Sequence, residues 1–204
     1  MAVWWMTEAI PIPATALLPL VLFPFLDVLD ASTAAAPYAH DLIFLFMGGF
    51  LLAVTMERWG LHKRIALRIL QAVGTTPNRV VLGFMIATAF LSMWISNTAT
   101  AAMMLPIAIA VGELLRPSDQ KGPYNFGLAL MLGMAYGASI GGVATLIGTP
   151  PNAVLAGAAS EILDVEIGFV QWMGVGLPIT LVMLPITWLM LTRILYPPGD
   201  LTGD

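Results

Sequence analysis

Long uncharged windows alternate with short charged stretches along the chain. The uncharged windows cover residues 9–26, 42–56, 80–112, 122–160 and 167–192. A helix needs about 20 residues to cross the hydrocarbon core of a bilayer, and several windows reach that length. Ala, Leu and Met dominate these windows, without the strict period-two alternation of a lipid-facing barrel strand. The pattern predicts an all-α, polytopic helical membrane protein.

The first 57 residues are expected to hold scaffold spans. Proline lacks the N–H donor that a helix interior needs, so a helix boundary is expected near Pro11. A Leu- and Pro-rich span should follow over residues 14–26, then a polar, acidic loop to Asp41 and a compact span over 42–56. The apolar stub before Pro11 is expected to be the tail of a truncated transmembrane helix.

Residues 58–79 have a different character, because arginines and lysines alternate there with isoleucines and leucines. This pattern predicts a basic amphipathic helix that lies in the cytoplasmic membrane interface, ends at Gly74 and Pro77, and contacts lipid headgroups. His40 and His62 are expected in surface loops, which makes neither a candidate for proton relay.

The window over residues 80–112 is too long for one crossing and too short for two. Its 33 residues would span ~50 Å as one helix, whereas two crossings need ~40 residues and a turn. A re-entrant hairpin of two half-depth helices over 80–116 fits this length. Ser96, Asn97 and Thr98, the strongly polar triplet in the window, should then form its tip.

The window over residues 122–160 is also too long for one span and must be interrupted. The prolines in Gly148-Thr149-Pro150-Pro151-Asn152 cannot continue a helix. We expect a long helix to about residue 147, a break, and a short helix from about residue 153. The remaining segments are then a broken transmembrane helix over 117–166, a last span over 167–196 and a polar tail over 197–204.

Composition excludes a soluble domain and gives little support to an enzyme. The 204 residues are 59% hydrophobic and include only 20 charged residues, twelve acidic and eight basic, against about a quarter in soluble domains. The sequence contains no cysteine, zinc-binding helix, nucleophile elbow or Walker loop, and no basic patch for nucleic acid. Carboxylates are absent from the middle of the expected spans, which favours Na⁺ over protons as a coupling ion.

Charge placement gives an orientation. If residues 80–112 return to the side they left, all eight basic residues fall on one side of the membrane, and the connections on the other side carry only acidic residues. Because basic loops stay in the cytoplasm, we expect a multi-pass protein of the plasma (inner) membrane with its basic loops cytoplasmic.

The two polar breaks are where we expect chemistry, because secondary transporters bind ions and substrates at such breaks. Na⁺ prefers oxygen ligands, and the candidates are Ser92, Ser96 and Asn97, with Gly148 letting the backbone approach. A carboxylate would be favoured at the helix N-termini that follow the breaks. Its candidate ligands are Ser96, Asn97, Thr98, Thr149 and Asn152. Taken singly, Ser92 is explained better by helix packing and interhelical hydrogen bonding than by ion binding.

Four motifs, at residues 4–13, 46–50, 94–100 and 148–152, resemble the divalent anion:sodium symporter family of di- and tricarboxylate carriers. The resemblance implies that Ser92, Ser96, Asn97 and Gly148 form a first sodium site and that Asn97 and Thr98 hold a substrate carboxylate. It also implies a homodimer and an inverted second half, so this chain is expected to be the N-terminal half of such a carrier.

The function expected from the sequence is sodium-coupled symport of dicarboxylates such as succinate, malate or fumarate. Bound, transported Na⁺ would supply the positive charge that no nearby Lys or Arg supplies. One alternative is a related antiporter or inorganic-anion carrier. Another is a truncated, non-transporting membrane scaffold, or one half of a split carrier.

Overall fold

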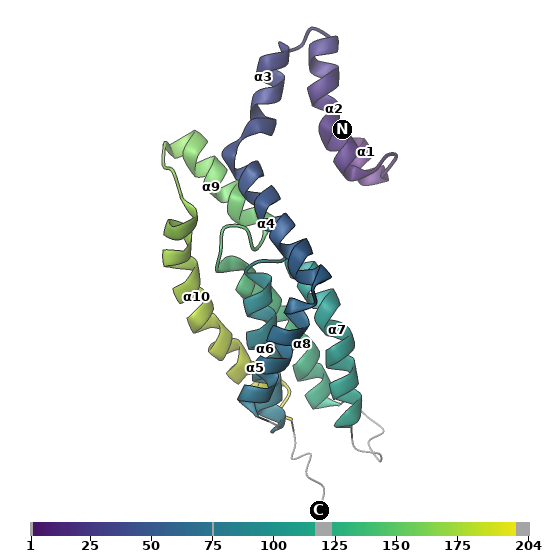
Figure 1. The fold of residues 1–204 in the computed structure, drawn as a ribbon, viewed down its shortest axis with the longest axis vertical. Coiled ribbons are helices and arrows are strands. Elements are labelled where there is room, and N and C mark those ends of the chain that lie inside the picture. Colours follow the sequence, from purple (N-terminus) through teal and green to yellow (C-terminus); the bar gives the residue numbers. More distant parts are fainter. Residues whose placement is uncertain (1, 75, 117–123, 199–204) are drawn as a thin grey trace, which may run out of the picture. The chain divides into compact units, whose positions relative to one another are not determined.

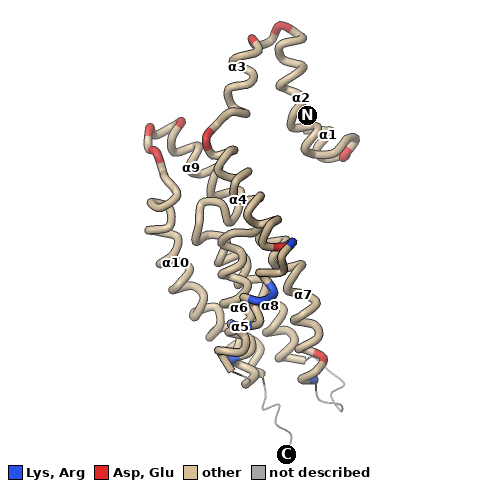
Figure 2. Tube along the Cα trace, in the orientation of Figure 1, with Lys and Arg blue, Asp and Glu red and all other residues tan. Residues whose placement is uncertain are grey.

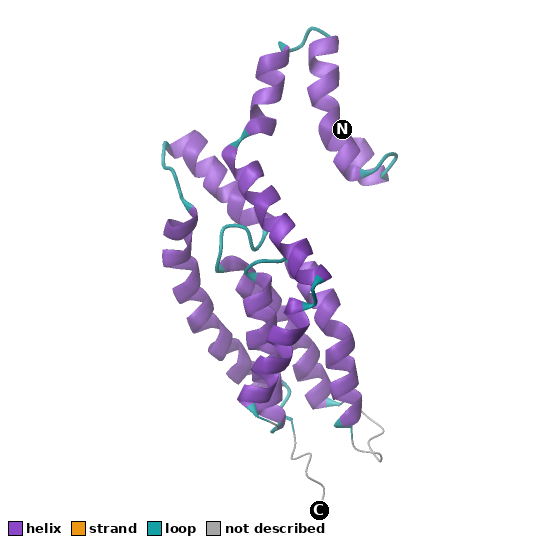
Figure 3. Ribbon diagram, viewed as in Figure 1, coloured by secondary structure: helices purple, strands orange, loops and turns teal. Residues whose placement is uncertain are grey.

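The computed structural model describes residues 2–74, 76–116 and 124–198. These residues form helices and short connections and include no strand (Figure 3). Among them, three helical segments are long and apolar enough to cross a membrane, or four if the bent pair Ala31–Ala39 and Asp41–Arg58 counts as one span. The predicted all-α, polytopic membrane architecture is therefore confirmed.

The chain divides into two compact units, Met1–Leu45 and Phe46–Asp204, and the first consists of short apolar helices (Figure 1). Its elements are α1 (Ala2–Thr7), α2 (Ile12–Phe25), α3 (Ala31–Ala35), the 3-10 turn η1 (Ala36–Ala39) and the start of α4 (Asp41–Arg58). Pro11 directly precedes α2, at the predicted boundary. The Tyr38 hydroxyl donates to the Ala16 carbonyl at 2.7 Å and ties η1 to α2.

The prediction of a polar loop before Asp41 is wrong, because α3 and η1 lie in that segment. Asp30 nucleates α3 as its N-cap: its carboxylate accepts hydrogen bonds from the Thr33 N–H and from the hydroxyls of Ser32 and Thr33. The same hydrogen bonds, that from the Ser32 hydroxyl first, hold the pKa of the Asp30 carboxyl well below its usual range. Acidic and hydroxyl residues that suggest a loop here form a helix cap.

The second unit is built around α6 and α8. After the rest of α4 it contains α5 (Leu61–Val73), α6 (Pro77–Ser92), α7 (Asn97–Leu114), α8 (Asn125–Val143), α9 (Pro150–Leu163), α10 (Phe169–Leu189) and the π-helical turn η2 (Met190–Leu195). Its core includes fully buried Phe84 and Met85 of α6 and Leu130 of α8. By contrast, α10 exposes many large apolar side chains, as a lipid-facing helix does.

Glycines let α8 lie unusually close to α6. Gly133, Gly137 and Gly141 are spaced four residues apart and so share one face of α8. A Cβ on Gly137 would lie 2.8 Å from the Met85 carbonyl oxygen, and one on Gly141 would overlap the backbone of Ala89. Small residues at such a crossing permit the close backbone packing that holds membrane helices together.

Two further expectations need correction. The helix before the break ends at Val143 rather than near residue 147, and the next begins at Pro150 rather than near residue 153. The prolines start α9 because proline lacks only a donor that the first helical turn does not use. His62 is wrong as a surface-loop residue: it lies within α5, is 4% exposed, and has its Nδ1 3.4 Å from the Met56 carbonyl oxygen.

Gly141→Ala tests the α6–α8 contact. The new methyl group would collide with the Ala89 backbone, which cannot rotate away, so we expect a loss of about 1–3 kcal/mol in unfolding free energy. The measurement is thermal unfolding of the purified chain in detergent.

The matched control is Gly174→Ala in α10, where no atom lies within 4 Å of the added Cβ. This variant should be stabilised by about 0.5–1 kcal/mol, because alanine favours a helix interior. Equal melting temperatures for the two variants would contradict the packing described here.

Candidate functional site

The predicted hairpin tip is a short connection between α6 and α7. α6 ends at Ser92 and α7 begins at Asn97, with Ser96 as the N-cap of α7. The Ser96 hydroxyl accepts a hydrogen bond from the Ala99 N–H at 3.3 Å. The Ser92 hydroxyl is fully buried and donates to Asn97 Oδ1 at 2.6 Å. Two predicted sodium ligands, from the two sides of the tip, are thus in direct contact.

Asn97 rests on the backbone of Gly142, near the end of α8. A Cβ on Gly142 would lie 3.0 Å from both Cγ and Nδ2 of Asn97 and would overlap Oδ1. Any larger residue at position 142 would therefore displace the Asn97 amide. The amide position is set by the absence of a side chain on the facing helix.

The second break, residues 144–149 between α8 and α9, lies beside the tip (Figure 3). Asn152, in the first turn of α9, donates through Nδ2 to the carbonyls of Gly142 and Thr145, each at 2.8 Å. The Thr145 hydroxyl donates to the Met93 carbonyl in the tip. Gly148 packs on Gly142, where a Cβ would lie 2.9 Å from the Gly142 Cα. These contacts hold the two breaks together.

The last carbonyls of α8 all accept hydrogen bonds from within the protein. Those of Ile140, Gly142 and Val143 accept hydrogen bonds from the Thr180 hydroxyl, Asn152 Nδ2 and Trp172 Nε1, at 3.0, 2.8 and 2.9 Å. The Gly141 carbonyl accepts from the Ala144 N–H at 3.0 Å. These four carbonyls are therefore engaged by protein donors.

The residues predicted to bind a substrate carboxylate do not all lie together. Asn97 and Asn152 both contact Gly142, but Asn152 is buried and its Nδ2 already serves the break. Thr98 is exposed in the first turn of α7, and Thr149 is the half-buried N-cap residue of α9 without a side-chain cap. Both threonines stand at helix N-termini, whose free N–H groups favour anions.

Residues 2–200 match the citrate transporter (CitMHS) family. The chain belongs to this family. It is 48% identical over 200 residues, 96% of its own length, to the sodium-dependent dicarboxylate transporter SdcS of Staphylococcus saprophyticus. It is 45% identical over the same share to the proteins of that name in Staphylococcus aureus strains USA300 and NCTC 8325.

The citrate transporter family match confirms the resemblance to carboxylate carriers, and it makes the chain a relative of transporters rather than of enzymes. With the apolar helices, it identifies an integral membrane protein. The aligned segment covers 38% of each of these relatives, so the chain spans well under half of their length.

Sequence reasoning missed three residues that assemble the site. The roles of Gly142 and Thr145 and the hydrogen bond of Trp172 were not expected. A buried threonine beside a helix break is a signal for Thr145, because its hydroxyl must find a partner within the protein. The role of Gly142 depends on a neighbour distant in sequence, and no local pattern reveals it.

A double-mutant cycle of Gly142→Ala and Asn97→Ala tests the contact between the Asn97 amide and the backbone of Gly142. The added methyl group meets Asn97 atoms first, so Gly142→Ala should cost less in the Asn97→Ala background. We expect a coupling of at least about 0.5 kcal/mol, measured by unfolding in detergent. The control pair Gly142→Ala with Gly174→Ala should be additive, and an additive first pair would refute the contact.

Proposed function

We propose that the chain forms one half of a sodium-coupled dicarboxylate symporter of the plasma membrane, with one Na⁺ site and half of the substrate site. The observation that carries the proposal is the meeting of the two helix breaks at Gly142, with Ser92 and Asn97 in contact. Secondary transporters place their sites at such breaks near the bilayer midplane. The names of the relatives support the choice of sodium and dicarboxylates.

The Na⁺ site consists of Ser92, Ser96, Asn97 and the backbone at Gly148. The side-chain ligands are uncharged oxygens, and no charged residue occurs in residues 80–112. The described residues contain no group of three or more His, Cys, Asp or Glu side chains that could hold a metal ion. A neutral oxygen site suits a monovalent ion better than a divalent one, because divalent sites use carboxylates.

The half-site for the dicarboxylate consists of Ser96, Asn97, Thr98, Thr149 and Asn152. The N-termini of α7 and α9 supply N–H groups and positive dipole ends to one substrate carboxylate. The bound Na⁺ supplies the remaining positive charge, so each ligand completes the site of the other. This mutual requirement couples the two in transport.

The rest of the carrier would come from a second, inverted repeat, and the assembly would be a homodimer. The aligned segment covers 38% of the relatives, which leaves room in their length for such a repeat. In this arrangement α6 and α7 are the two arms of the re-entrant hairpin, and α8 with α9 is the broken span. Two alternatives can be distinguished by experiment. Competition by other substrates in uptake assays would identify an antiporter or inorganic-anion carrier, and the absence of any response to Na⁺ would identify a scaffold.

Asn97→Ala should abolish Na⁺-dependent succinate uptake while membrane insertion stays intact, because it removes an oxygen ligand shared by both sites. The assay uses proteoliposomes of a fusion in which this chain replaces the aligned 200-residue segment of the S. saprophyticus relative. Asn125→Ala is the matched control, since among the described residues its exposed amide donates to the Pro197 carbonyl at 3.4 Å, away from the tip. It should keep near-normal uptake.

Near-normal uptake by the Asn97→Ala fusion would overturn the site assignment. An inserted, monodisperse parent fusion that shows no Na⁺-dependent uptake would overturn the proposed function itself.

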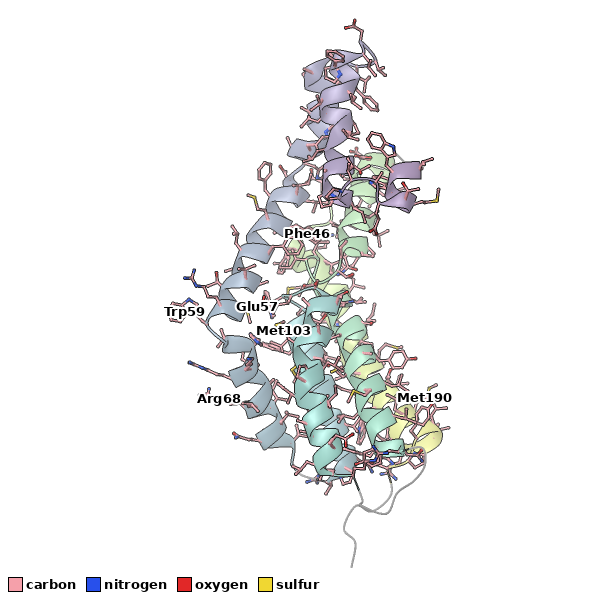
Figure 4. All side chains as sticks on the ribbon, turned by 90° about the vertical axis from the view of Figure 1, so that its right-hand side faces the viewer. Phe46, Glu57, Trp59, Arg68, Met103 and Met190 are labelled. Carbon is pink, nitrogen blue, oxygen red and sulfur yellow. The ribbon has the colours of Figure 1, made fainter. Side chains whose placement is uncertain are left out.

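The basic positions of the second unit lie away from the acidic connection between α9 and α10, which supports an orientation with cytoplasmic basic loops. Figure 2 shows acidic positions at the connection between α9 and α10, and basic positions on α5 and at the opposite end of the helices. Trp59 lies just before α5 and is 74% exposed. Its side chain and that of Arg68 in α5 both project away from the unit (Figure 4). Exposed tryptophan beside basic residues is typical of a membrane interface.

Single cysteines test this topology in a chain that has none of its own. Cysteines replacing Arg79 and Lys121 should both react with an impermeant maleimide from the cytoplasmic side, and Glu161→Cys only from the outside. Lys121 lies outside the described residues. Labelling of the first two positions from opposite sides would mean that residues 80–112 cross the membrane.

A further inference from the structure

Thr100 carries a buried hydroxyl that lacks a hydrogen-bond partner among the described residues. The residue is 0% exposed, and its Oγ1 contacts no donor or acceptor there. Other threonines in the described helices behave differently: those at Thr55, Thr88 and Thr192 donate to the carbonyl four residues earlier, at 2.7, 2.7 and 2.8 Å. Thr100 thus forgoes the bond that its own helix offers.

The Ser96 carbonyl is the acceptor four residues before Thr100. It accepts the Thr100 backbone N–H at 2.9 Å but not the Thr100 hydroxyl. A hydroxyl removed from water without a partner destabilises a protein, whereas valine has the same shape and no such cost. A purely structural role therefore does not explain a threonine at this position.

The place of Thr100 in α7 connects it to the tip. It lies in the first turn of the helix, three residues after Asn97, and residues three apart are neighbours on a helix surface. Their Cβ atoms are then about 5–6 Å apart, close enough for both side-chain oxygens to reach one ion. Asn97 faces α8 through Gly142, and Thr100 is buried in the same unit.

We infer that Thr100 Oγ1 is a further oxygen ligand of the sodium ion held by Ser92 and Asn97 at the tip. This inference rests on the proposed function. Because Thr100 is fully buried, the group it meets must be small and stripped of water, which fits a cation better than a dicarboxylate. The hydroxyl adds a neutral oxygen, consistent with a site for a monovalent ion.

The test compares Thr100→Val, which removes the hydroxyl and keeps the shape, with Thr100→Ser, which keeps the hydroxyl. The readout is the rise in melting temperature of the 204-residue chain in detergent as NaCl replaces choline chloride. Thr100→Val should need at least tenfold more Na⁺ for the half-maximal rise, and Thr100→Ser less than threefold more. In choline alone, Thr100→Val should melt at or above the parent temperature, because its unpaired buried hydroxyl is gone.

Thr192→Val is the matched control, because Thr192 is also buried but its hydroxyl is satisfied by the Trp188 carbonyl. It should melt lower in choline and keep the parent Na⁺ response. If Thr100→Val folds poorly, Thr100→Ala replaces it, because alanine also removes the hydroxyl and is smaller. The same tenfold rise in the Na⁺ concentration for half-maximal stabilisation is then expected.

The outcomes separate the two levels of inference. A parent chain that responds to Na⁺, together with a Thr100→Val chain that responds equally, overturns the role of Thr100 and leaves the proposed function standing. A folded parent chain without any Na⁺ response contradicts the Na⁺ site itself, and the role of Thr100 falls with it.

Discussion

The close backbone contact at Gly142 is the constraint on which the site depends. Asn97 rests on this glycine from the hairpin side, Gly148 packs on it from the break, and its carbonyl accepts from Asn152. The contact exists only because Gly133, Gly137 and Gly141 let α8 lie against the backbone of α6. A stripe of small residues along one helix thereby fixes the relative position of two helix breaks that are about 50 residues apart in sequence.

Irregular backbone at membrane depth is tolerated only where its polar groups find partners inside the protein. The break after α8 meets this condition with side chains from two helices: Asn152 of α9, and Trp172 and Thr180 of α10. Because α10 donates to the end of α8 and, through Trp188, to the Asn78 carbonyl at the start of α6, it binds the hairpin and the broken helix into one unit. The site therefore depends on hydrogen bonds from a helix that contributes no predicted ligand.

Window lengths predicted most of the architecture, because the bilayer limits how long an apolar helix can be. The tip at Ser96 and Asn97, the basic helix and the last span all follow from that limit and from charge spacing. Predictions from local polarity were wrong at helix caps and at one helix face. Asp30 caps a helix where a loop was expected, and Pro150 begins α9. His62 lies on the buried face of α5 and not in a surface loop. The contact of Ser92 with Asn97 was within reach of sequence reasoning, since both residues flank one short turn. The role of Gly142 was not, because it depends on a neighbour distant in sequence.

The occupied carbonyls at the end of α8 have a thermodynamic consequence. Since protein donors already satisfy Ile140, Gly141, Gly142 and Val143, the break keeps its shape without any ligand. A ligand that enters such a preorganised site loses little of its binding free energy to the ordering of loops. Selectivity between ions can then come from the fixed spacing of a few oxygens, because the hydrogen-bonded backbone around them does not readjust to an ion of another size.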